Sequence, residues 1–252
     1  YRQANESGGS FRMEYRLKRK DGCIVWLEDH ASLASDEQGN LTRWQGVCLD
    51  TTARKRSELV QSATYRIAQA ALAAQNLDEF FDAVHDVIFE LIPASNMYIA
   101  TYDPKSGLLS FPFWSDEHDP RPLPQKPIRG LTEYVMRSRE SQLVDHVRFQ
   151  QLAASGEIYL TDIGTMSVDW LGTPLIIADE VIVVLVVQSY SSSSRLGKNE
   201  QNILEFISGQ IAMTIDRMQA EEALRESEDR YSLAVRGAND GVEIRLGSPA
   251  FC

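Results

Sequence analysis

The first pattern in the chain is a strict alternation of apolar and charged residues. Four apolar side chains share one face of this segment, and charged side chains fill the other, as a half-buried β-strand requires. These are Phe11, Met13, Tyr15 and Leu17. Clusters of turn-forming residues separate this run from two further strand-like runs. The sequence therefore predicts three consecutive antiparallel strands, at 11–18, 24–34 and 41–49.

After residue 52 the period changes to that of a helix, with apolar residues recurring every three or four positions. This stripe consists mostly of small side chains: Leu59, Ala63, Ile67, Ala70, Ala71 and Ala74. Small side chains permit close packing, so the helix is expected either to pair with a second protomer or to lie on its own domain. A second helix is predicted to begin at Asn76, with Glu79 as its capping partner, and to end before Pro93.

The next hundred residues contain short strands and one long helix. Strands are predicted at 97–101, 108–114, 142–145, 170–177 and 181–190, a short helix at 130–138, and a long helix from Lys198. The two last strands are apolar at almost every position, which predicts the centre of a sheet that is covered on both faces. Mixed strands and helices in this order indicate an α+β fold.

Composition narrows the function classes. With 252 residues, 43% of them hydrophobic and 24% charged, the chain is long enough for one or two domains with proper cores. A net charge of −11, from 25 basic and 36 acidic residues, argues against nucleic-acid binding. The three cysteines show no disulfide or metal-ligand spacing, which is typical of a reducing cytosol. The longest apolar run, 181–187, is far too short for a bilayer, so this segment is expected to be cytoplasmic, without membrane contact.

The N-terminal strands resemble a known sensory family. Trp26 follows a Lys-Asp-Gly turn, and Asp50, Thr51 and Thr52 stand just before the basic start of a helix. This arrangement resembles the C-terminal part of PAS domains, which usually carry Asp-Ile-Thr at that place, so Thr51 departs from the family. The resemblance implies that residues 1–56 are the closing part of a PAS domain whose opening half lies outside this chain. It also implies a role for Asp50 and Thr52 in signal transmission.

The central segment resembles a second sensory family. A helix, a hairpin, the run GLTEYVMRSRESQLVD, the two apolar strands and the long helix follow one another in the order of a GAF domain. Ala178 and Val183 stand where that family commonly has glycine, and Gln142 where it often has proline. The resemblance implies a GAF-type central antiparallel sheet flanked by helices, preceded by the C-terminal strands of a PAS domain and joined by long linker helices. The expected domains are 1–56 (PAS part), 57–76 (linker helix), 77–218 (GAF domain) and 219–252 (connector helix and start of a second PAS domain).

The GAF resemblance implies a candidate ligand pocket between the sheet and the elements on one face. Six residues are the candidates for its lining: Tyr98, Trp114, Tyr134, His146, Asp162 and Trp170. Core packing is the alternative for each aromatic, and a surface-loop role for the polar ones. No cysteine lies between residues 49 and 251, which excludes a covalent bilin and a cysteine-based sulfoxide reductase within this domain. No metal site is predicted, and the identity of any cofactor stays open.

Together these patterns predict a non-enzymatic sensory module of a bacterial multidomain signalling protein. Its output domain, a histidine kinase or an enzyme of cyclic-di-GMP turnover, would lie outside this chain. A homodimer through the helices at 54–75 and 202–230 is expected to carry the signal. Its pairing seam would consist of Ile207, Ile211, Ile215 and Met218. The alternatives are a dimerisation scaffold that binds no ligand and, further from the pattern, an enzyme whose site is unrecognised.

Overall fold

The computed structural model describes residues 10–20, 24–35, 38, 41–92, 94, 96–159, 164–177 and 179–243. The chain divides into two compact units, residues 1–62 and 63–252. The boundary falls inside a helix, α2 (Thr52–Ala73). The first part of α2 therefore belongs to the N-terminal unit and the rest to the C-terminal unit.

The N-terminal unit is a three-stranded antiparallel sheet in the order β1-β2-β3. Its strands are β1 (Phe11–Lys18), β2 (Ile24–Ser35) and β3 (Leu41–Asp50), which confirms the three predicted strands. Burial is shallow here. Met13 and Leu17, on the face predicted to be apolar, are 38% and 44% exposed, and Val25 is the one buried apolar side chain of the described strand residues.

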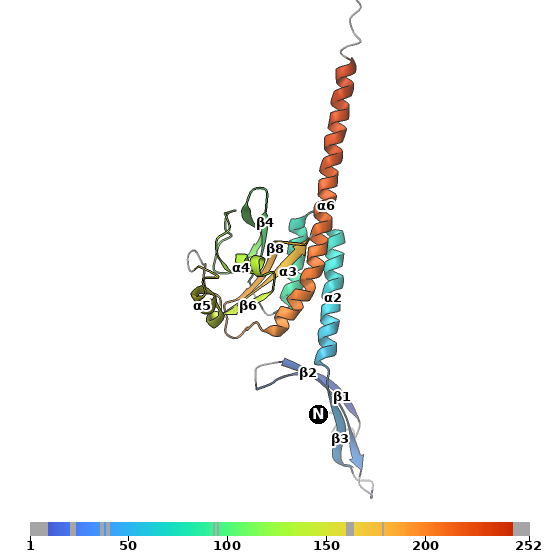
Figure 1. Ribbon diagram of the computed structural model, residues 1–252. Helices are drawn as coiled ribbons and strands as arrows, with labels where there is room; N and C mark the ends of the chain where they lie inside the picture. The colour runs from blue at the N-terminus through green and yellow to red at the C-terminus, as the bar shows by residue number, and fades with distance from the viewer. Residues whose placement is uncertain are drawn as a thin grey trace, which may run out of the picture. The chain divides into compact units, whose positions relative to one another are not determined.

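The C-terminal unit has a five-stranded antiparallel sheet in the order β5-β4-β8-β7-β6 (Figure 1). Its strands are β4 (Asn96–Asp103), β5 (Leu108–Ser115), β6 (Gln142–Asp145), β7 (Asp169–Ile177) and β8 (Glu180–Ser189). Its other helices are α3 (Leu77–Leu91), α4 (Leu131–Ser138), α5 (His146–Ala154) and α6 (Lys198–Glu243). The fold is α+β, as predicted. None of the described helices combines the length and apolarity that a bilayer crossing requires.

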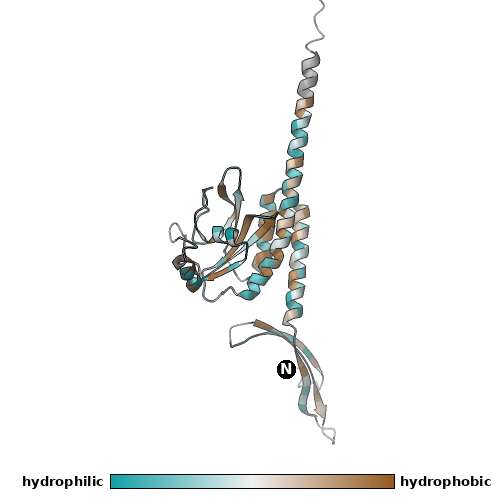
Figure 2. Ribbon diagram, in the orientation of Figure 1, coloured by the Kyte–Doolittle hydropathy of each residue, from teal (hydrophilic) through white to brown (hydrophobic). Residues whose placement is uncertain are grey.

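Both faces of this sheet are covered, and each face has its own core. Successive strand residues point to opposite faces. Met97 and Leu185 pack with α2, α3 and α6, whereas Tyr98 and Val186 pack with α4 and α5. Helices therefore cover one face and a mixture of short helices and loops the other (Figure 1), and the central strands are apolar along their length (Figure 2). This two-sided burial is the reason that β7 and β8 lack a polar face.

The alanine-rich stripe of α2 packs on its own domain. Ala63, Ile67 and Ala71 are buried in the core shared with α3 and α6, which is the second of the two uses expected for it. At the next helix, the Asn76 side chain accepts a hydrogen bond from the Glu79 backbone N–H at 2.9 Å, and the Glu79 carboxylate accepts one from the Gln75 backbone N–H at 2.9 Å. The predicted cap of α3 is confirmed.

The predicted pairing seam on α6 is wrong. Ile207, Ile211 and Ile215 are at most 1% exposed, because α6 lies across the sheet and against α3. Met218, the fourth residue of the predicted seam, is half-buried against the same core. Intramolecular packing uses this apolar row. A different row on α6, with Phe206 and Met213 at 55% and 60% exposure, faces solvent.

Two local features differ from expectation or refine it. The helix α5 was not predicted, because only Phe149 and Leu152 are buried in it, and two apolar positions define no clear period.

The turn between β7 and β8 is closed by Asp179, whose φ of 64° lies in the left-handed region. Aspartate tolerates that region better than most residues, which explains how the turn forms without glycine. Ala178 lies outside the described residues.

Candidate functional site

A cavity of about 430 Å³ lies on the face of the sheet that carries Tyr98 and Trp170. The short helices α4 and α5 and the long loop after β5 contribute its other walls. That loop is tied to the sheet by paired backbone hydrogen bonds between Leu109 and Gln125, of 2.8 and 2.9 Å. A volume in this range is typical of small-molecule sites in proteins.

Aromatic rings form the inner wall. The rings of Tyr98 and Trp114 stack at 4.9 Å with an interplanar angle of 23°, and Phe111 meets Trp114 edge-on at 5.6 Å. Tyr98 and Trp114 lie opposite one another on β4 and β5, so cross-strand pairing places them in contact. Trp170 comes from β7, and the aromatic wall therefore joins three of the five strands.

Hydrogen bonds fix these rings in place. The Tyr98 hydroxyl shares a 2.9 Å hydrogen bond with the Thr132 hydroxyl and accepts one from the Trp170 indole N–H at 3.3 Å. The Trp114 indole N–H donates to the Asp119 backbone carbonyl at 2.9 Å. Burial raises the pKa of Tyr98 to about 12, because the interior disfavours the phenolate. The wall is therefore neutral and preorganised at physiological pH.

Carboxylates hold the surrounding loops. Glu133, in the first turn of α4, is 6% exposed and accepts hydrogen bonds from the backbone N–H groups of Ile128 and Gly130 at 2.9 and 3.1 Å. Asp119 accepts from both the backbone N–H and the hydroxyl of Thr165, at 2.7 and 3.0 Å. These polar contacts fix the described loop residues Ile128, Gly130 and Thr165 beside the cavity.

The structure brings together four of the six predicted pocket residues: Tyr98, Trp114, His146 and Trp170 all line the cavity. Tyr134 is not among its lining residues; it is half-buried on α4 with the Arg137 guanidinium 5.9 Å from its ring centre. Asp162 lies outside the described residues.

Sequence reasoning missed several polar lining residues, among them Thr132, Glu133 and Asp119. A weak signal for Glu133 was present, since it stands three residues after Gly130 at a helix start, the position of a reciprocal capping residue. Nothing in the local sequence distinguishes Asp119 from its exposed loop neighbours. Among the described residues, no group of three or more His, Cys, Asp or Glu is placed to hold a metal ion.

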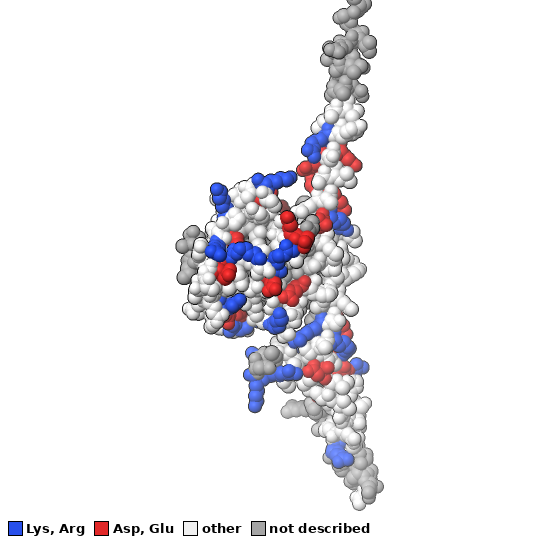
Figure 3. Space-filling view, viewed as in Figure 1, with Lys and Arg blue, Asp and Glu red and all other residues white. Residues whose placement is uncertain are grey.

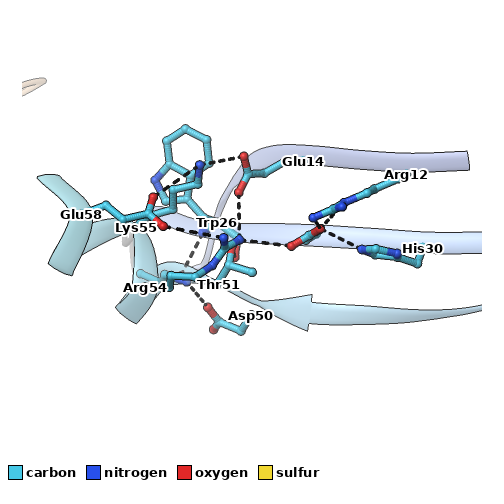
Figure 4. Close-up of polar contacts among 11 residues, drawn as sticks. Arg12, Glu14, Trp26, His30, Asp50, Thr51, Arg54, Lys55 and Glu58 are labelled. Carbon is cyan, nitrogen blue, oxygen red and sulfur yellow. Dashed lines mark hydrogen bonds and ion pairs between the residues drawn. The ribbon is translucent and has the colours of Figure 1, made fainter.

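A second candidate site is the junction at which β3 passes into α2 (Figure 4). The Thr52 hydroxyl accepts a hydrogen bond from the Trp26 backbone N–H, the Trp26 carbonyl accepts one from the Thr51 N–H, and the Asp50 carboxylate accepts one from the Thr52 N–H, each at 2.9 Å. Hydrogen bonding from Thr52, through its side chain first and its backbone N–H second, lowers the pKa of Asp50. The two predicted transmission residues therefore fix the start of α2 to the middle strand of the sheet.

Ion pairs reinforce this junction. The Glu28 carboxylate, with its side chain 8% exposed, accepts from Arg12, from His30 at 2.8 Å and from Arg54 at 3.2 Å (Figure 4). The hydrogen bond from His30 is the main cause that lowers the pKa of Glu28, and Arg12 adds to it. Lys55 pairs with Glu14 of β1 at 2.8 Å. The first turn of α2 is thus held to both β1 and β2 through charged side chains.

Family models match both parts of the chain. The family model described as GAF domain matches residues 74–216, and the model described as PAS fold matches residues 1–48. A GAF domain structure from a phosphoenolpyruvate-protein phosphotransferase of Coxiella burnetii is 20% identical, with a TM-score of 0.52 over 66% of this chain and 98% of that one. The corresponding Acinetobacter domain is 17% identical, with a TM-score of 0.52 over 64% of this chain and 94% of that one. These likenesses show the fold.

One curated protein extends the comparison to almost the whole chain. The methyl sulfide methyltransferase-associated sensor of Methanosarcina acetivorans is 23% identical over 255 residues, which cover 97% of this chain and 25% of that protein. The chain thus spans about a quarter of the length of that relative.

Proposed function

Because the chain belongs to the GAF domain family, we propose that it is a sensory module that binds a small molecule in the cavity next to Tyr98 and Trp114. The observation that carries this proposal is the cavity itself, which combines about 430 Å³ of space with an aromatic wall fixed by hydrogen bonds. Pockets of this size, mostly apolar with a few oriented polar groups, are the usual form of small-molecule sites. The sensor relative supports a regulatory role.

A short physical connection runs from the cavity to α6. Trp170 lines the cavity, and the preceding residue, Asp169, is buried at the start of β7. The Asp169 carboxylate accepts hydrogen bonds from Arg195 Nε at 2.6 Å, from Arg195 Nη2 at 2.9 Å and from the Leu196 backbone N–H at 2.9 Å. These residues lie just before α6 begins at Lys198. A ligand that shifts Trp170 would therefore act on the start of α6 through a single adjacent residue.

The proposal includes a homodimer that forms through α2 and α6. Large apolar side chains remain exposed on both helices: Tyr65 and Leu72 on α2, and Phe206, Met213, Leu224 and Tyr231 on α6. On α6, Phe206, Met213 and Ala220 are spaced seven residues apart, and so are Leu224 and Tyr231, which begin four residues after Ala220. This combination of seven- and four-residue steps matches the a and d positions of a two-stranded coiled coil. The segment 221–230 is exposed throughout and carries charges of both signs (Figure 3).

Signal transfer would continue into domains outside this chain. We propose that the junction at Asp50 and Thr52 receives a signal from the PAS-type segment, and that α6 passes the combined signal to an output domain of histidine kinase or cyclic-di-GMP type. We propose that this segment lies in the cytoplasm in the parent protein. The large share of the sensor relative that this chain does not cover leaves room for such domains there.

The ligand proposal is tested by native mass spectrometry of the purified full chain. A mass excess is expected for the wild type and is expected to be lost in Trp114→Ala. The matched control is Phe113→Ala, because Phe113 is the adjacent residue of β5 and packs against the opposite face of the sheet. Both variants should lose stability through the cavity that they create, but only Trp114→Ala should lose the bound mass.

The scaffold alternative predicts a different result from the same measurement. If the wild type carries no bound mass and gains no thermal stability from any compound in a metabolite library, the cavity is not a ligand site, and dimerisation is the function that remains.

The dimer is tested separately by sedimentation. Met213→Glu is expected to shift the chain to monomer, and an unchanged dimer would exclude the exposed row of α6 as the interface.

A further inference from the structure

Acidic side chains outnumber basic ones around the cavity. Of its lining residues, Asp119, Glu133 and Asp145 carry carboxylates, whereas Arg121 carries the one guanidinium and His146 the one imidazole. None of the three carboxylates forms an ion pair with a described Lys, Arg or His. Their hydrogen bonds come from backbone N–H groups and a hydroxyl instead. Asp119 and Glu133 therefore lack a cationic partner within the described part of the chain, whereas Asp145 interacts electrostatically with Arg195.

Glu133 is the most informative of these groups. It is 6% exposed, and its two hydrogen bonds come from neutral backbone donors. Removing a carboxylate from water without a cationic partner is unfavourable. The first turn of α4 offsets part of that cost through the helix dipole, but a positive charge inside the cavity would offset it further.

The aromatic wall favours the same charge. Ring faces carry negative electrostatic potential, and they attract cations most strongly in sites from which water is excluded. The cavity is lined by Tyr98, Phe111, Trp114 and Trp170, and burial keeps Tyr98 protonated. Two independent features of one cavity, its aromatic rings and the carboxylates of Asp119 and Glu133, thus favour a positively charged group.

We propose that the ligand of this cavity is a small organic cation, an ammonium compound with an apolar body, and not a phosphate or carboxylate. This inference rests on the proposed ligand-binding function. An anion would find the guanidinium of the exposed Arg121 and the imidazole of His146, and would face the carboxylates of Asp119, Glu133 and Asp145. A cation in the cavity would be attracted by these carboxylates and by the aromatic ring faces.

The test compares charged probes with neutral probes of the same shape on the wild-type full chain. Choline is paired with 3,3-dimethyl-1-butanol, and phenyltrimethylammonium with tert-butylbenzene; cyclic GMP serves as the anionic probe. Binding is followed by tryptophan fluorescence, which reports on Trp114 and Trp170, and by thermal stability. At least one cation is expected to bind about tenfold more tightly than its neutral partner, and cyclic GMP is expected not to bind.

Charge-removing variants locate the effect. Glu133→Gln is expected to weaken the cation about tenfold and to leave the neutral probe unchanged. Because Glu133 also accepts hydrogen bonds from two backbone N–H groups, this variant can fail to fold. Asp119→Asn therefore repeats the test at a second carboxylate of the cavity, and it is also expected to weaken binding of the cation. The control is Glu140→Gln, an exposed carboxylate near the end of α4 that does not line the cavity.

The outcomes separate this inference from the function on which it rests. Equal binding of neutral and charged probes, or preferential binding of cyclic GMP, would overturn the cation proposal while supporting a ligand site. Absence of binding by every probe, together with no bound mass in native mass spectrometry, would overturn both. A cation preference that survives both Glu133→Gln and Asp119→Asn would contradict the assignment of the charge to these carboxylates.

Discussion

At the residue scale, Tyr98 links the aromatic wall to its polar supports. Its pKa is raised from the ordinary value of 10.0 to about 12, chiefly by burial. Below pH 10 the tyrosine is protonated in both the folded and the unfolded chain. Between pH 10 and 12 the unfolded chain releases this proton first, so stability should fall as pH rises, by about 1.4 kcal/mol per pH unit.

Urea unfolding at pH 9, 10 and 11 checks this expectation, with Tyr98→Phe as the comparison. The variant should be less stable than wild type at pH 9, by roughly 1–3 kcal/mol, since it strands the Thr132 hydroxyl and the Trp170 indole N–H. Its stability should then fall less steeply with pH. Parallel curves for the two proteins would show that Tyr98 titrates normally.

Gly172 makes room for an indole of the cavity wall. A Cβ atom built on Gly172 would lie 2.2 Å from the Trp170 ring, which is far inside van der Waals contact. Gly172→Ala should therefore displace Trp170, cost roughly 1–3 kcal/mol of stability and weaken ligand binding. The control is Gly209→Ala, because no atom lies within 4 Å of a Cβ there and a helical alanine is favourable. Unchanged binding in Gly172→Ala would separate Trp170 from the site.

At the element scale, β7 carries both a wall of the cavity and the anchor of α6. Replacing Arg195 by Met leaves the buried Asp169 carboxylate with the Leu196 N–H as its main partner. The cost should be roughly 2 kcal/mol, below the 3–5 kcal/mol typical of a fully buried pair, because Arg195 is half-exposed. Hydrogen exchange at 195–201 should accelerate.

The same substitution elsewhere provides the matched control. Arg139→Met breaks the ion pair with Asp179, whose side chain is 97% exposed, and should cost less than about 1 kcal/mol. Equal losses in the two variants would mean that the burial of Asp169 adds nothing to its pairing with Arg195, and the proposed route from Trp170 to α6 would lose its support.

At the scale of the whole molecule, the two units differ in the depth of their cores. The C-terminal sheet has a buried apolar layer on each face, whereas the described strands of the N-terminal sheet bury the apolar side chain of Val25 alone. Since apolar burial is the main stabilising term, β1–β3 should unfold at lower urea concentration than β4–β8. Hydrogen exchange resolves the two transitions, and equal protection at 11–50 and 169–189 would contradict this expectation.

The length of α6 between domains should control signalling. One inserted residue rotates everything downstream by about 100°, whereas seven residues nearly restore the phase. Insertions of one to seven residues after Ala220, in a full-length protein that contains this segment, should therefore change output activity with a seven-residue period. Equal activity at every length would exclude transmission through a helix pair.

The sequence by itself determined most of the secondary structure. Alternation identified the three strands of the first unit, and the two-sided apolar runs identified the central position of β8. Asn76 and Glu79 marked the start of α3 because capping depends on neighbours within one turn. Such features are local, so composition and spacing are sufficient to predict them. The weakly patterned α5 shows the limit, since its two buried residues leave no readable period.

Only the tertiary structure decided which partner each apolar or polar surface meets. The row at Ile207, Ile211 and Ile215 has the spacing of a dimer seam, yet the same spacing serves equally for packing on α3 and the sheet. Tyr134 and Trp114 were equivalent as sequence candidates, but only Trp114 lines the cavity. Burial depends on contacts between residues far apart in the chain, and no local pattern records them.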